Sequence, residues 1–374
     1  MVLAAELEML RDSARRLAED ARPAQWSSIG RRGRSDPALW AAIAGNGWLF
    51  AGLDESAGGF GFGAVEMAVL MEEVGRGLIA EPLLANMVGL KLVARLAPDQ
   101  LRDQVVAAVT EGRSKIALAY AEPDSRFAWQ EPGTTIHSGG DALTLDGVKS
   151  VVMGGADADL LLVVAQQAGD LVVVLVPVAT DGVTVDGYAL IDGTSGADVR
   201  FVDVRLTADA RIGCGALAVA AVAEAIDFAT VAICAQAVGA MTVTLDTTLD
   251  YVKQRVQFGQ PIGTNQVLQH RLVDMLRMIK EAEILTAAAV AALDGDGAIE
   301  RGLAVSAAKI HVCDAARKVG QEAVQMHGAI GTTDEAAISH YFRRLIALGP
   351  LFGDGNHHRN RFAALDTAQR ATAQ

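Results

Sequence analysis

Apolar residues recur at helical spacing through the first third of the chain. Over residues 4–21 the apolar positions form one stripe, made of Leu7, Leu10, Ala14 and Leu17. Residues 35–37 (Ser-Asp-Pro) form a helix start with proline in the first turn. Further helices are predicted over 64–74 and 82–96. We therefore predict an N-terminal helical domain over residues 1–115.

The pattern changes to short apolar or alternating runs between residues 116 and 212. Residues 141–148 alternate around an expected turn at Asp146-Gly147, and 160–165 and 171–176 are almost wholly apolar. Two more runs follow at 184–188 and 199–206. No helical pattern alternates with these runs, so they predict an antiparallel β-barrel or sandwich domain rather than a doubly wound sheet.

From about residue 213 the helical pattern returns and continues to the end. The expected segments are 216–254, 265–294, 301–328 and 335–347. Joined by short turns, they predict a C-terminal four-helix bundle domain over 213–374. The polar tail 364–374 is expected to fray. The fold class is therefore α+β, in the order α, β, α.

Composition narrows the classes of function. The net charge is −13 and no basic stripe could neutralise phosphates, which argues against nucleic-acid binding. The three cysteines, Cys214, Cys234 and Cys313, form no C-x-x-C pair, so we expect small core residues in a reducing compartment. Residues 1–17 carry acids where a signal peptide would be apolar, so we expect no signal peptide and a cytoplasmic location.

One uncharged run, Phe228–Leu245, is long enough to be considered as a membrane span. It contains Gln236, Gly239 and several threonines, and it continues without a break into a polar segment. We therefore expect a helix buried in a helical core, and no membrane insertion.

A glycine-rich loop contains G-x-G-x-x-A, with Gly59, Gly61 and Ala64 at the spaced positions. This is close to a dinucleotide-binding fingerprint. That fingerprint needs a preceding strand inside a βαβ unit, and the surroundings here are helical. We interpret the loop as a structural turn.

Residues 251–275 predict a helix, a tight turn and a second helix that restarts behind a capping Thr or Asn. This corner carries a cation (Arg255), an aromatic ring (Phe258), glycines and an amide (Gln266). Arginine offers phosphate a fork of donors, and glycine allows close backbone approach. The corner is therefore a candidate site for a planar, phosphate-bearing ligand.

A second candidate is the break between helices that contains Gln325, Gly328 and Gly331. Backbone N–H groups exposed at such a break suit the polar edge of a nucleotide or a flavin. An ordinary helix stop followed by a capped restart explains the same glycines.

The third candidate is Asp354, which lies between glycines after an apolar Leu-Phe pair. A carboxylate in an apolar pocket has a raised pKa and can act as a base, whereas the alternative is an aspartate in an ordinary turn. The neighbouring pair His357-His358 suggests a metal, but adjacent histidines point apart on a helix and no other ligand is near. We therefore expect no metal site.

These motifs together resemble the acyl-CoA dehydrogenase family over essentially the whole chain. They occur in the family's order: the loop at 58–61, Ala121-Glu122-Pro123, the Arg255–Gln266 corner, Gln325-x-x-Gly328-x-x-Gly331, and a carboxylate before glycine at Asp354. The wording of several segments is more similar to a bacterial subgroup. That subgroup includes chains named as small subunits of pimeloyl-CoA dehydrogenase.

The resemblance implies an FAD cofactor, an α–β–α fold, and tetramers built from dimers in which each flavin contacts two subunits. It implies that Arg255 and Phe258, with Gln266 nearby, touch the adenosine-diphosphate end of a neighbour's FAD. Gln325, Gly328 and Gly331 would hold the same end. The residues expected beside the flavin ring and pyrophosphate are Tyr120, Ala121, Ser125, Val151 and Met153.

The resemblance also implies the reaction. Asp354 falls where the family has its glutamate base, which removes the α-proton of an acyl-CoA thioester while the β-hydride passes to FAD. The product would be a trans-2-enoyl-CoA, and an electron-transfer flavoprotein would reoxidise the flavin. The acyl chain, whether straight, dicarboxylic or cyclic, is not indicated.

Three departures from the family pattern keep alternatives open. Asp354 is one methylene shorter than glutamate. Residues 121–128 (Ala-Glu-Pro-Asp-Ser-Arg-Phe-Ala) replace the family's T-E-P-G-A-G-S-D, so the hydroxyls expected at the flavin are missing or moved. Residues 151–153 (Val-Val-Met) replace its W-x-T. The chain could be a flavin oxidase of the nitroalkane-oxidase type, or a non-catalytic or half-site subunit. The assembly could be a homo-oligomer or a hetero-oligomer with a paralogous large subunit.

Overall fold

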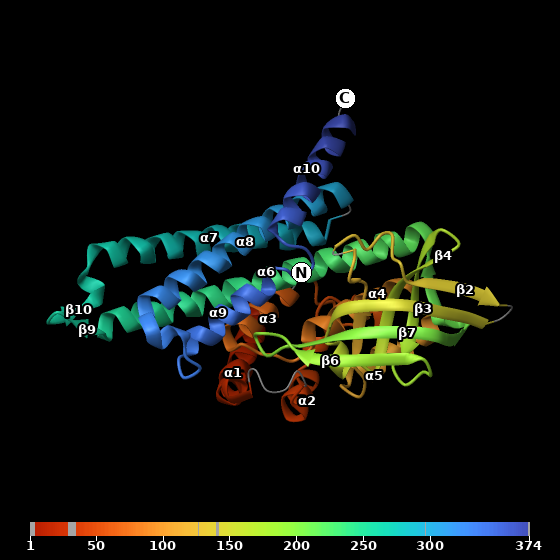
Figure 1. Ribbon diagram of the computed structural model, residues 1–374, viewed down its shortest axis with the longest axis horizontal. Coiled ribbons are helices and arrows are strands. Elements are labelled where there is room, and N and C mark those ends of the chain that lie inside the picture. Colours follow the sequence, from red (N-terminus) through yellow and green to blue (C-terminus); the bar gives the residue numbers. More distant parts are fainter. Residues whose placement is uncertain (1–3, 29–34, 126, 140–141, 296, 373–374) are drawn as a thin grey trace. The chain divides into compact units, whose positions relative to one another are not determined.

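The computed structural model describes residues 4–28, 35–125, 127–139, 142–295 and 297–372. The elements run along the chain as helices, then strands, then helices, as predicted (Figure 1). The chain divides into two compact units. Residues 1–29, 64–79 and 230–374 form one, called here the helical unit, and residues 30–63 and 80–229 form the other, the sheet unit. The three-domain division at residues 116 and 213 stays a prediction.

Within the described residues, the sheet unit is built on one eight-stranded sheet, in which seven strands follow the order β6-β7-β3-β2-β4-β5-β8 and the eighth, β1, pairs with β4. The strands are β1 (Ile116–Ala119), β2 (Thr135–Gly139), β3 (Ala142–Met153), β4 (Leu160–Gln167), β5 (Asp170–Pro177), β6 (Val183–Ala189), β7 (Ser195–Thr207) and β8 (Arg211–Cys214). Its core is aliphatic, and the central strands β4 and β5 are buried along almost their whole length. Such strands read as continuous apolar runs because both of their faces are covered.

The sheet is mixed and open, which corrects the expected antiparallel barrel. Most neighbours are antiparallel, but β1 pairs parallel with β4, and β2 meets β4 in parallel at Thr135 and Gln166. An apolar run shows that a strand is buried, but it does not show which neighbour the strand pairs with or in which direction.

The turn expected at Asp146-Gly147 is wrong, because β3 runs straight through this dipeptide. The pairing with β7 shifts register between Leu145 and Gly147, so the dipeptide forms a bulge. Asp146 accepts a hydrogen bond from the backbone N–H of Asp203 (2.8 Å). A Cβ on Gly147 would lie 2.5 Å from Thr134 Oγ1, so glycine is required by close approach.

Three longer helices belong to the sheet unit: α2 (Pro37–Gly45), α4 (Leu83–Leu96) and α5 (Asp99–Thr110). The glycine-rich loop between α2 and α3 (Ala64–Gly77) follows a short 3-10 helix, not a strand. A Cβ on Gly59 would lie 2.1 Å from the carbonyl oxygen of Leu53, so close backbone approach explains this glycine. The interpretation of the loop as a structural turn is confirmed.

Glu81 binds the backbone just before α2 and makes the stability of the protein depend on pH. Its Oε1 accepts the backbone N–H of Asp36, while its Oε2 is buried without a hydrogen-bond partner among the described residues. Burial, reinforced by the carboxylates of Asp36 and Asp157, raises the pKa of Glu81 to about 7.

Replacing Glu81 by Gln is expected to flatten the pH dependence of unfolding. The unfolded glutamate titrates near its ordinary pKa, so the stabilisation from the neutral acid is present below that value and is lost as pH rises through 7. The unfolding free energy of the variant, relative to that of the wild type, should be roughly 2–3 kcal/mol higher at pH 8 than at pH 4. Urea unfolding at both pH values measures this, with exposed Glu131→Gln as control; equal pH slopes for wild type and E81Q would refute it.

The helical unit contains α1 (Ala4–Ser28), α3 (Ala64–Gly77), α7 (Gln266–Leu293), α8 (Ala298–His327), α9 (Ala337–Leu348) and α10 (Gly355–Thr372), with most of α6 (Gly215–Gln254). Helices α3 and α6 touch backbone to backbone. A Cβ on Gly75 would lie 1.9 Å from the carbonyl oxygen of Gln236, and one on Gly239 would lie 2.0 Å from that of Glu72. Glycine at both positions lets N-terminal and C-terminal helices share one core.

Helix α10 corrects the expectation of a fraying tail, because it continues through Thr372. It packs on α8, where Leu365 lies so close that a Cβ on Gly302 would be 2.6 Å from its Cδ1. Arg370 and Asp366 form an ion pair one turn apart (3.0 Å). The close approach at Gly302, the ion pair of Arg359 with Asp314 and the hydrogen bond from Gln369 to Glu300 hold this largely polar helix against α8.

Helix α6 is the one described helix that is long and apolar enough to cross a membrane. Within its most apolar window, 72% of the residues are buried inside the protein, which fits the expected core helix. The cysteines only partly match their prediction. Cys234 is buried and Cys313 partly buried, but Cys214 is exposed at the end of β8, because a terminal strand residue leaves the core.

Candidate functional site

The predicted corner after α6 is a two-residue β-hairpin. Strands β9 (Val256–Gln257) and β10 (Gln260–Pro261) pair antiparallel around Phe258 and Gly259, which have φ of +52° and +80°. Positive φ at both central positions is typical of a type I′ turn, in which glycine is common and phenylalanine is not. A bulky residue there costs about 1–3 kcal/mol, so the protein holds Phe258 in a strained position.

The side chains of this hairpin face solvent. The Phe258 ring is fully exposed, and the exposed guanidinium of Arg255 has no carboxylate partner within the described part of the chain. Gln266, also exposed, opens α7. Asn265 occupies the expected N-cap position, but its side chain donates to the carbonyl of Ile262 and caps no helical N–H.

The second predicted segment closes α8 and needs its glycines. Gly328 has φ +69° and ψ −145°, and its N–H returns to the carbonyls of Val324 and Gln325. A Cβ on Gly331 would lie 2.9 Å from the Cβ of His327. The helix-stop interpretation is thus sufficient for these glycines, and the exposed Gln325 is left facing solvent.

Tyr251 and His327 join these two segments, and sequence reasoning gave neither residue a role. Their rings stack with centroids 4.3 Å apart, and the Tyr251 hydroxyl donates to the His327 carbonyl (3.2 Å). Burial lowers the pKa of His327, which keeps its ring neutral near pH 7. Tyr251 lies one helical turn before Arg255, and His327 directly precedes Gly328, so one contact couples both halves of the candidate nucleotide site. In the sequence, the only sign of such a role is that both residues lie close to predicted site residues, Arg255 and Gly328.

In the sheet unit, the residues expected beside the flavin form a second group. Strand β1 ends at Ala119, so residues 120–125 are a loop. The N–H of Ser150 donates to the carbonyl of Ala121 (2.9 Å), and Lys149 Nζ donates to the carbonyl of Tyr120 (3.4 Å). The loop with Tyr120, Ala121 and Ser125 is therefore bound along the part of β3 that carries Val151 and Met153.

A buried ion pair also holds this loop against β3. Lys149, with no exposed side-chain surface, donates to Glu122 Oε1 at 2.6 Å. Glu122 also accepts from the N–H groups of Gly133 and Thr134 and from the Thr134 hydroxyl. Burial lowers the pKa of Lys149 to about 8 against the influence of Glu122, while bonds from Lys149 and Thr134 outweigh burial and lower the pKa of Glu122.

Val151 occupies a strained bulge in β3. Its φ is +51°, an outlier for a β-branched residue, and the pairing with β7 shifts between Lys149 and Val152. Asp198 Oδ1 accepts both the Val151 N–H (3.0 Å) and the Tyr188 hydroxyl (3.0 Å). The bulge turns the Val151 side chain outward, where it is 47% exposed. Backbone strain held by a specific carboxylate is common at functional sites.

Asp354 is half-buried and occupies the N-cap position of α10. Its Oδ1 accepts the backbone N–H of His357 at 2.8 Å. The preceding Phe352 and Gly353 have φ of +55° and +111°, and a Cβ on Gly353 would lie 2.5 Å from His357 Cδ2. Asp354 therefore lies in a turn, as one alternative expected, and its carboxylate is also held in one orientation, as the other expected. The hydrogen bond from His357 and the constrained backbone of residues 352 and 353 fix that orientation.

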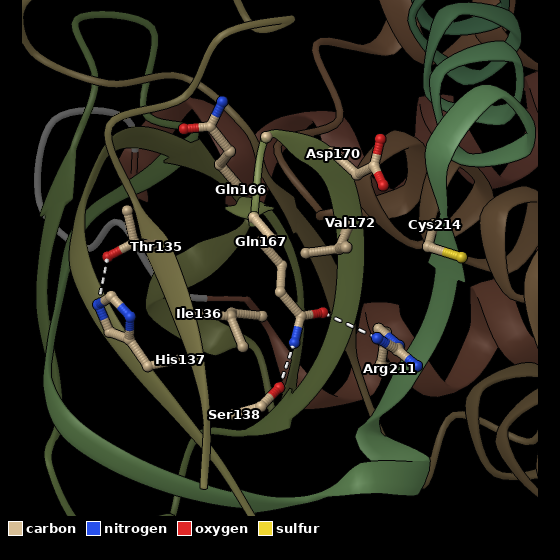
Figure 2. A pocket seen from close by; sticks show the side chains of 12 residues that line it. Thr135, Ile136, His137, Ser138, Gln166, Gln167, Asp170, Val172, Arg211 and Cys214 are labelled. Carbon is tan, nitrogen blue, oxygen red and sulfur yellow. Dashed lines mark hydrogen bonds between the residues drawn. The ribbon is translucent and has the colours of Figure 1, made fainter.

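A pocket of about 650 Å³ lies in the sheet unit, away from all of these residues. It is lined by β2, the β4–β5 turn and β8, where Arg211 donates to Gln167 and Gln167 donates to Ser138 (Figure 2). No predicted site residue lines it. Its lining combines buried Ile136 and Val172 with polar side chains that bond to one another.

Both ends of the chain match one family. Residues 4–113 match the N-terminal domain of acyl-CoA dehydrogenases, and residues 219–365 match the C-terminal domain. The chain belongs to the acyl-CoA dehydrogenase family, and it is a FAD-dependent oxidoreductase. The family resemblance stated from the motifs is thereby confirmed.

Individual relatives agree with this assignment. The human mitochondrial short-chain specific acyl-CoA dehydrogenase is 26% identical over 80% of this chain and 75% of its own. A Tcur3481–Tcur3483 steroid ACAD variant superposes with a TM-score of 0.89 at 27% identity, over 99% of this chain and 100% of the other. A chain of the ChsE4–ChsE5 complex from Mycobacterium tuberculosis shares the fold at 23% identity and a TM-score of 0.88, with 97% of each chain covered.

The residues present fit the cofactor in both units. In the Arg255–Phe258 hairpin, a guanidinium that meets no carboxylate among the described residues and a fully exposed ring suit a phosphate and a planar base. The backbone of the loop at 120–125 is held against β3 by the hydrogen bond from Ser150 to Ala121, and the bulge at Val151 exposes a small aliphatic side chain beside it. Ser125 offers the hydroxyl of this loop.

Proposed function

We propose that this chain introduces an α,β double bond into an acyl-CoA thioester, with Asp354 as the base. The observation that carries the assignment is the locked cap. A carboxylate fixed by the N–H of His357 and by the strained Phe352-Gly353 backbone is held ready for one orientation of substrate. Asp354 also follows the family order of motifs, because it precedes a glycine near the C-terminus.

In this mechanism the protein supplies orientation and proton removal. A thioester carbonyl makes the α-hydrogen acidic, and the Asp354 carboxylate, oriented by the N–H of His357, takes that proton. Bound FAD supplies the acceptor for the hydride from the β-carbon. Because aspartate is one methylene shorter than glutamate, the loop at 349–353 has to bring the carboxylate closer through its backbone, and the locked conformation at Gly353 is consistent with that task.

We further propose that Arg255, Phe258 and Gln266 bind the adenosine-diphosphate end of FAD, together with Gln325, Gly328 and Gly331. The exposure of Arg255, Phe258, Gln266, Gln325 and Gly328 supports contact with a flavin carried by a second subunit, whereas Gly331 is buried behind them. A hairpin that keeps a phenylalanine both strained and fully exposed is costly in a lone chain, and contact with a partner's cofactor would offset that cost.

Arg255→Ala is expected to loosen FAD while leaving the fold intact. The lost contact is a charge-assisted hydrogen bond to phosphate, worth about 1.5–3 kcal/mol, so FAD affinity should fall roughly 10- to 100-fold. Flavin fluorescence after dialysis measures the loss, and the exposed Arg277→Ala on α7 is the control. A variant that retains full flavin under dialysis would contradict the assignment.

We propose an assembly of at least two subunits, either of this chain alone or with a paralogous large subunit, located in the cytoplasm. The solved relatives named for a Tcur3481–Tcur3483 pair and a ChsE4–ChsE5 complex support the paired form. The wording shared with small subunits of pimeloyl-CoA dehydrogenase supports the same form and a dicarboxylyl-CoA substrate. An electron-transfer flavoprotein is the proposed acceptor. Co-expression with a neighbouring paralogue followed by size measurement tests the assembly.

One observation favours a second function, that of an oxidase. Val151 and Met153 stand where the family has a tryptophan and a hydroxyl, and Val151 is small and exposed. A flavin beside small aliphatic side chains is less shielded from oxygen. Rapid oxygen consumption by the reduced protein without an added acceptor would favour the oxidase over the dehydrogenase.

A further inference from the structure

One face of α8 holds the segment that leads to Asp354. Lys309 Nζ donates to the carbonyl of Leu348 (2.8 Å), and Cys313 Sγ donates to the carbonyl of Gly349 (3.5 Å). These side chains are four residues apart on α8, so they lie on one face of the helix. They satisfy the carbonyls at the end of α9, which have no partner within their own helix.

Lys309 is unusual because its amino group is buried and has no carboxylate partner among the described residues. It is 2% exposed, and no ion pair joins it to any acid in the described ranges. The partial negative charge at the C-terminus of α9 is what compensates it. Burying an unpaired ammonium costs several kcal/mol, and a methionine or leucine would fill the same space more cheaply. We therefore attribute the lysine at this position to its hydrogen bond with the carbonyl of Leu348 and not to packing.

His358 also holds the segment that leads to Asp354, at the carbonyl of Phe352, two residues before the aspartate. It is 1% exposed, with Nε2 3.2 Å from the carbonyl oxygen of Phe352 and Nδ1 3.3 Å from Ser306 Oγ. The carbonyl can only accept, so Nε2 carries the proton and Nδ1 accepts from the Ser306 hydroxyl. Burial, helped by the charge of Lys309, lowers the pKa of His358 to about 3, so the ring stays neutral in any ordinary assay.

From this geometry we infer that Lys309 and His358 are positioning residues for the base. Together they fix one carbonyl before the turn that leads to Asp354 and one within it. They hold that turn in the left-handed conformation of Phe352 and Gly353. The inference rests on the proposed role of Asp354, and it adds the support that lets a short carboxylate reach the substrate.

The strain in this turn explains why such support is needed. A phenylalanine at φ +55° costs about 1–3 kcal/mol and persists only where its surroundings fix it. Releasing the carbonyls would let the turn relax and move the carboxylate. A misplacement of about 1 Å can slow a reaction on the order of 100-fold without weakening substrate binding.

The test uses the FAD-loaded protein with Lys309→Met, which keeps length and apolar volume but removes the donor. Anaerobic stopped-flow measures flavin reduction by butyryl-CoA, octanoyl-CoA or pimeloyl-CoA, whichever reduces the wild type fastest. We expect reduction to slow about 10- to 100-fold with an apparent Kd for the acyl-CoA within about 2-fold of wild type. Hydrogen exchange of residues 349–354 should become faster. Lys318→Met, an exposed lysine on the same helix, is the control.

A double variant separates positioning from general damage. In the Asp354→Asn background, Lys309→Met should slow reduction no further, because the group that it positions has been removed. Ser306→Ala removes only the hydroxyl that faces His358, and it should slow reduction about 3- to 10-fold in a protein that folds normally. This milder variant keeps the proposal testable if Lys309→Met fails to fold.

The outcomes distinguish this proposal from the function on which it rests. Wild-type reduction rates in both Lys309→Met and Ser306→Ala, with no reduction in Asp354→Asn, would overturn the positioning role and leave the base assigned. Wild-type rates in Asp354→Asn would remove the base and the positioning role together. A wild type reduced by none of the three thioesters would count against the proposed function itself.

Discussion

Asp354→Asn should bind FAD normally yet reduce it at least about 100-fold more slowly than the wild type with any acyl-CoA. The amide oxygen can still accept the N–H of His357, so the cap of α10 and the turn before it stay in place. The amide cannot take a proton, and loss of a general base slows the chemical step about 10²- to 10⁴-fold. Anaerobic bleaching of the flavin absorbance measures the effect directly.

The matched control for this variant is Asp366→Asn on the same helix, where a partly exposed carboxylate pairs with Arg370. It removes one negative charge from α10 without touching the turn before it. Bleaching at the wild-type rate in Asp354→Asn would show that another group is the base. A loss of FAD in Asp354→Asn, but not in the control, would assign the aspartate to folding instead of chemistry.

Lys149→Met should have the largest effect on stability and on the flavin-side loop. It leaves the Glu122 carboxylate with donors only from Gly133 and Thr134 and releases the carbonyl of Tyr120. Removing one partner of a buried ion pair typically costs about 3 kcal/mol or more. The loop at 120–125 should loosen, so we expect lower FAD content as well as a lower unfolding free energy.

The ion pair can be separated from simple packing by adding Glu122→Gln. The double variant contains no uncompensated charge and should recover part of the unfolding free energy lost in Lys149→Met. Urea unfolding with and without added FAD measures both effects. Equal stability of wild type and Lys149→Met would mean that the buried ammonium contributes nothing to the flavin-side loop.

Much of this architecture could be predicted from the sequence because it depends on local periodicity. The long helices α6 to α9 and the central strands β4 and β5 were indicated by apolar spacing alone. The corner at Arg255 and the carboxylate at Asp354 were indicated by unusual residues beside glycines. Such features are encoded within a few residues of one another, so no tertiary contact is needed to find them.

What the sequence could not give depends on contacts between distant residues. The parallel pairing of β1 with β4, the stacking of Tyr251 on His327 and the grip of Asp198 on the Val151 bulge each join segments tens of residues apart. The end of α10 was expected to fray because the contacts that hold it, such as that of Leu365 with Gly302, are made with the distant helix α8. The left-handed Val151 and Phe352 were equally hidden, since neither residue type favours that conformation.

The most direct test of the account is anaerobic titration of the FAD-loaded protein with butyryl-, octanoyl-, pimeloyl- and cyclohexanecarboxyl-CoA. It should be done with the chain alone and with a co-expressed neighbouring paralogue. The account predicts that at least one thioester bleaches the flavin, with one enoyl-CoA formed per FAD reduced. Stoichiometric FAD that is bleached by no thioester in either preparation would contradict it.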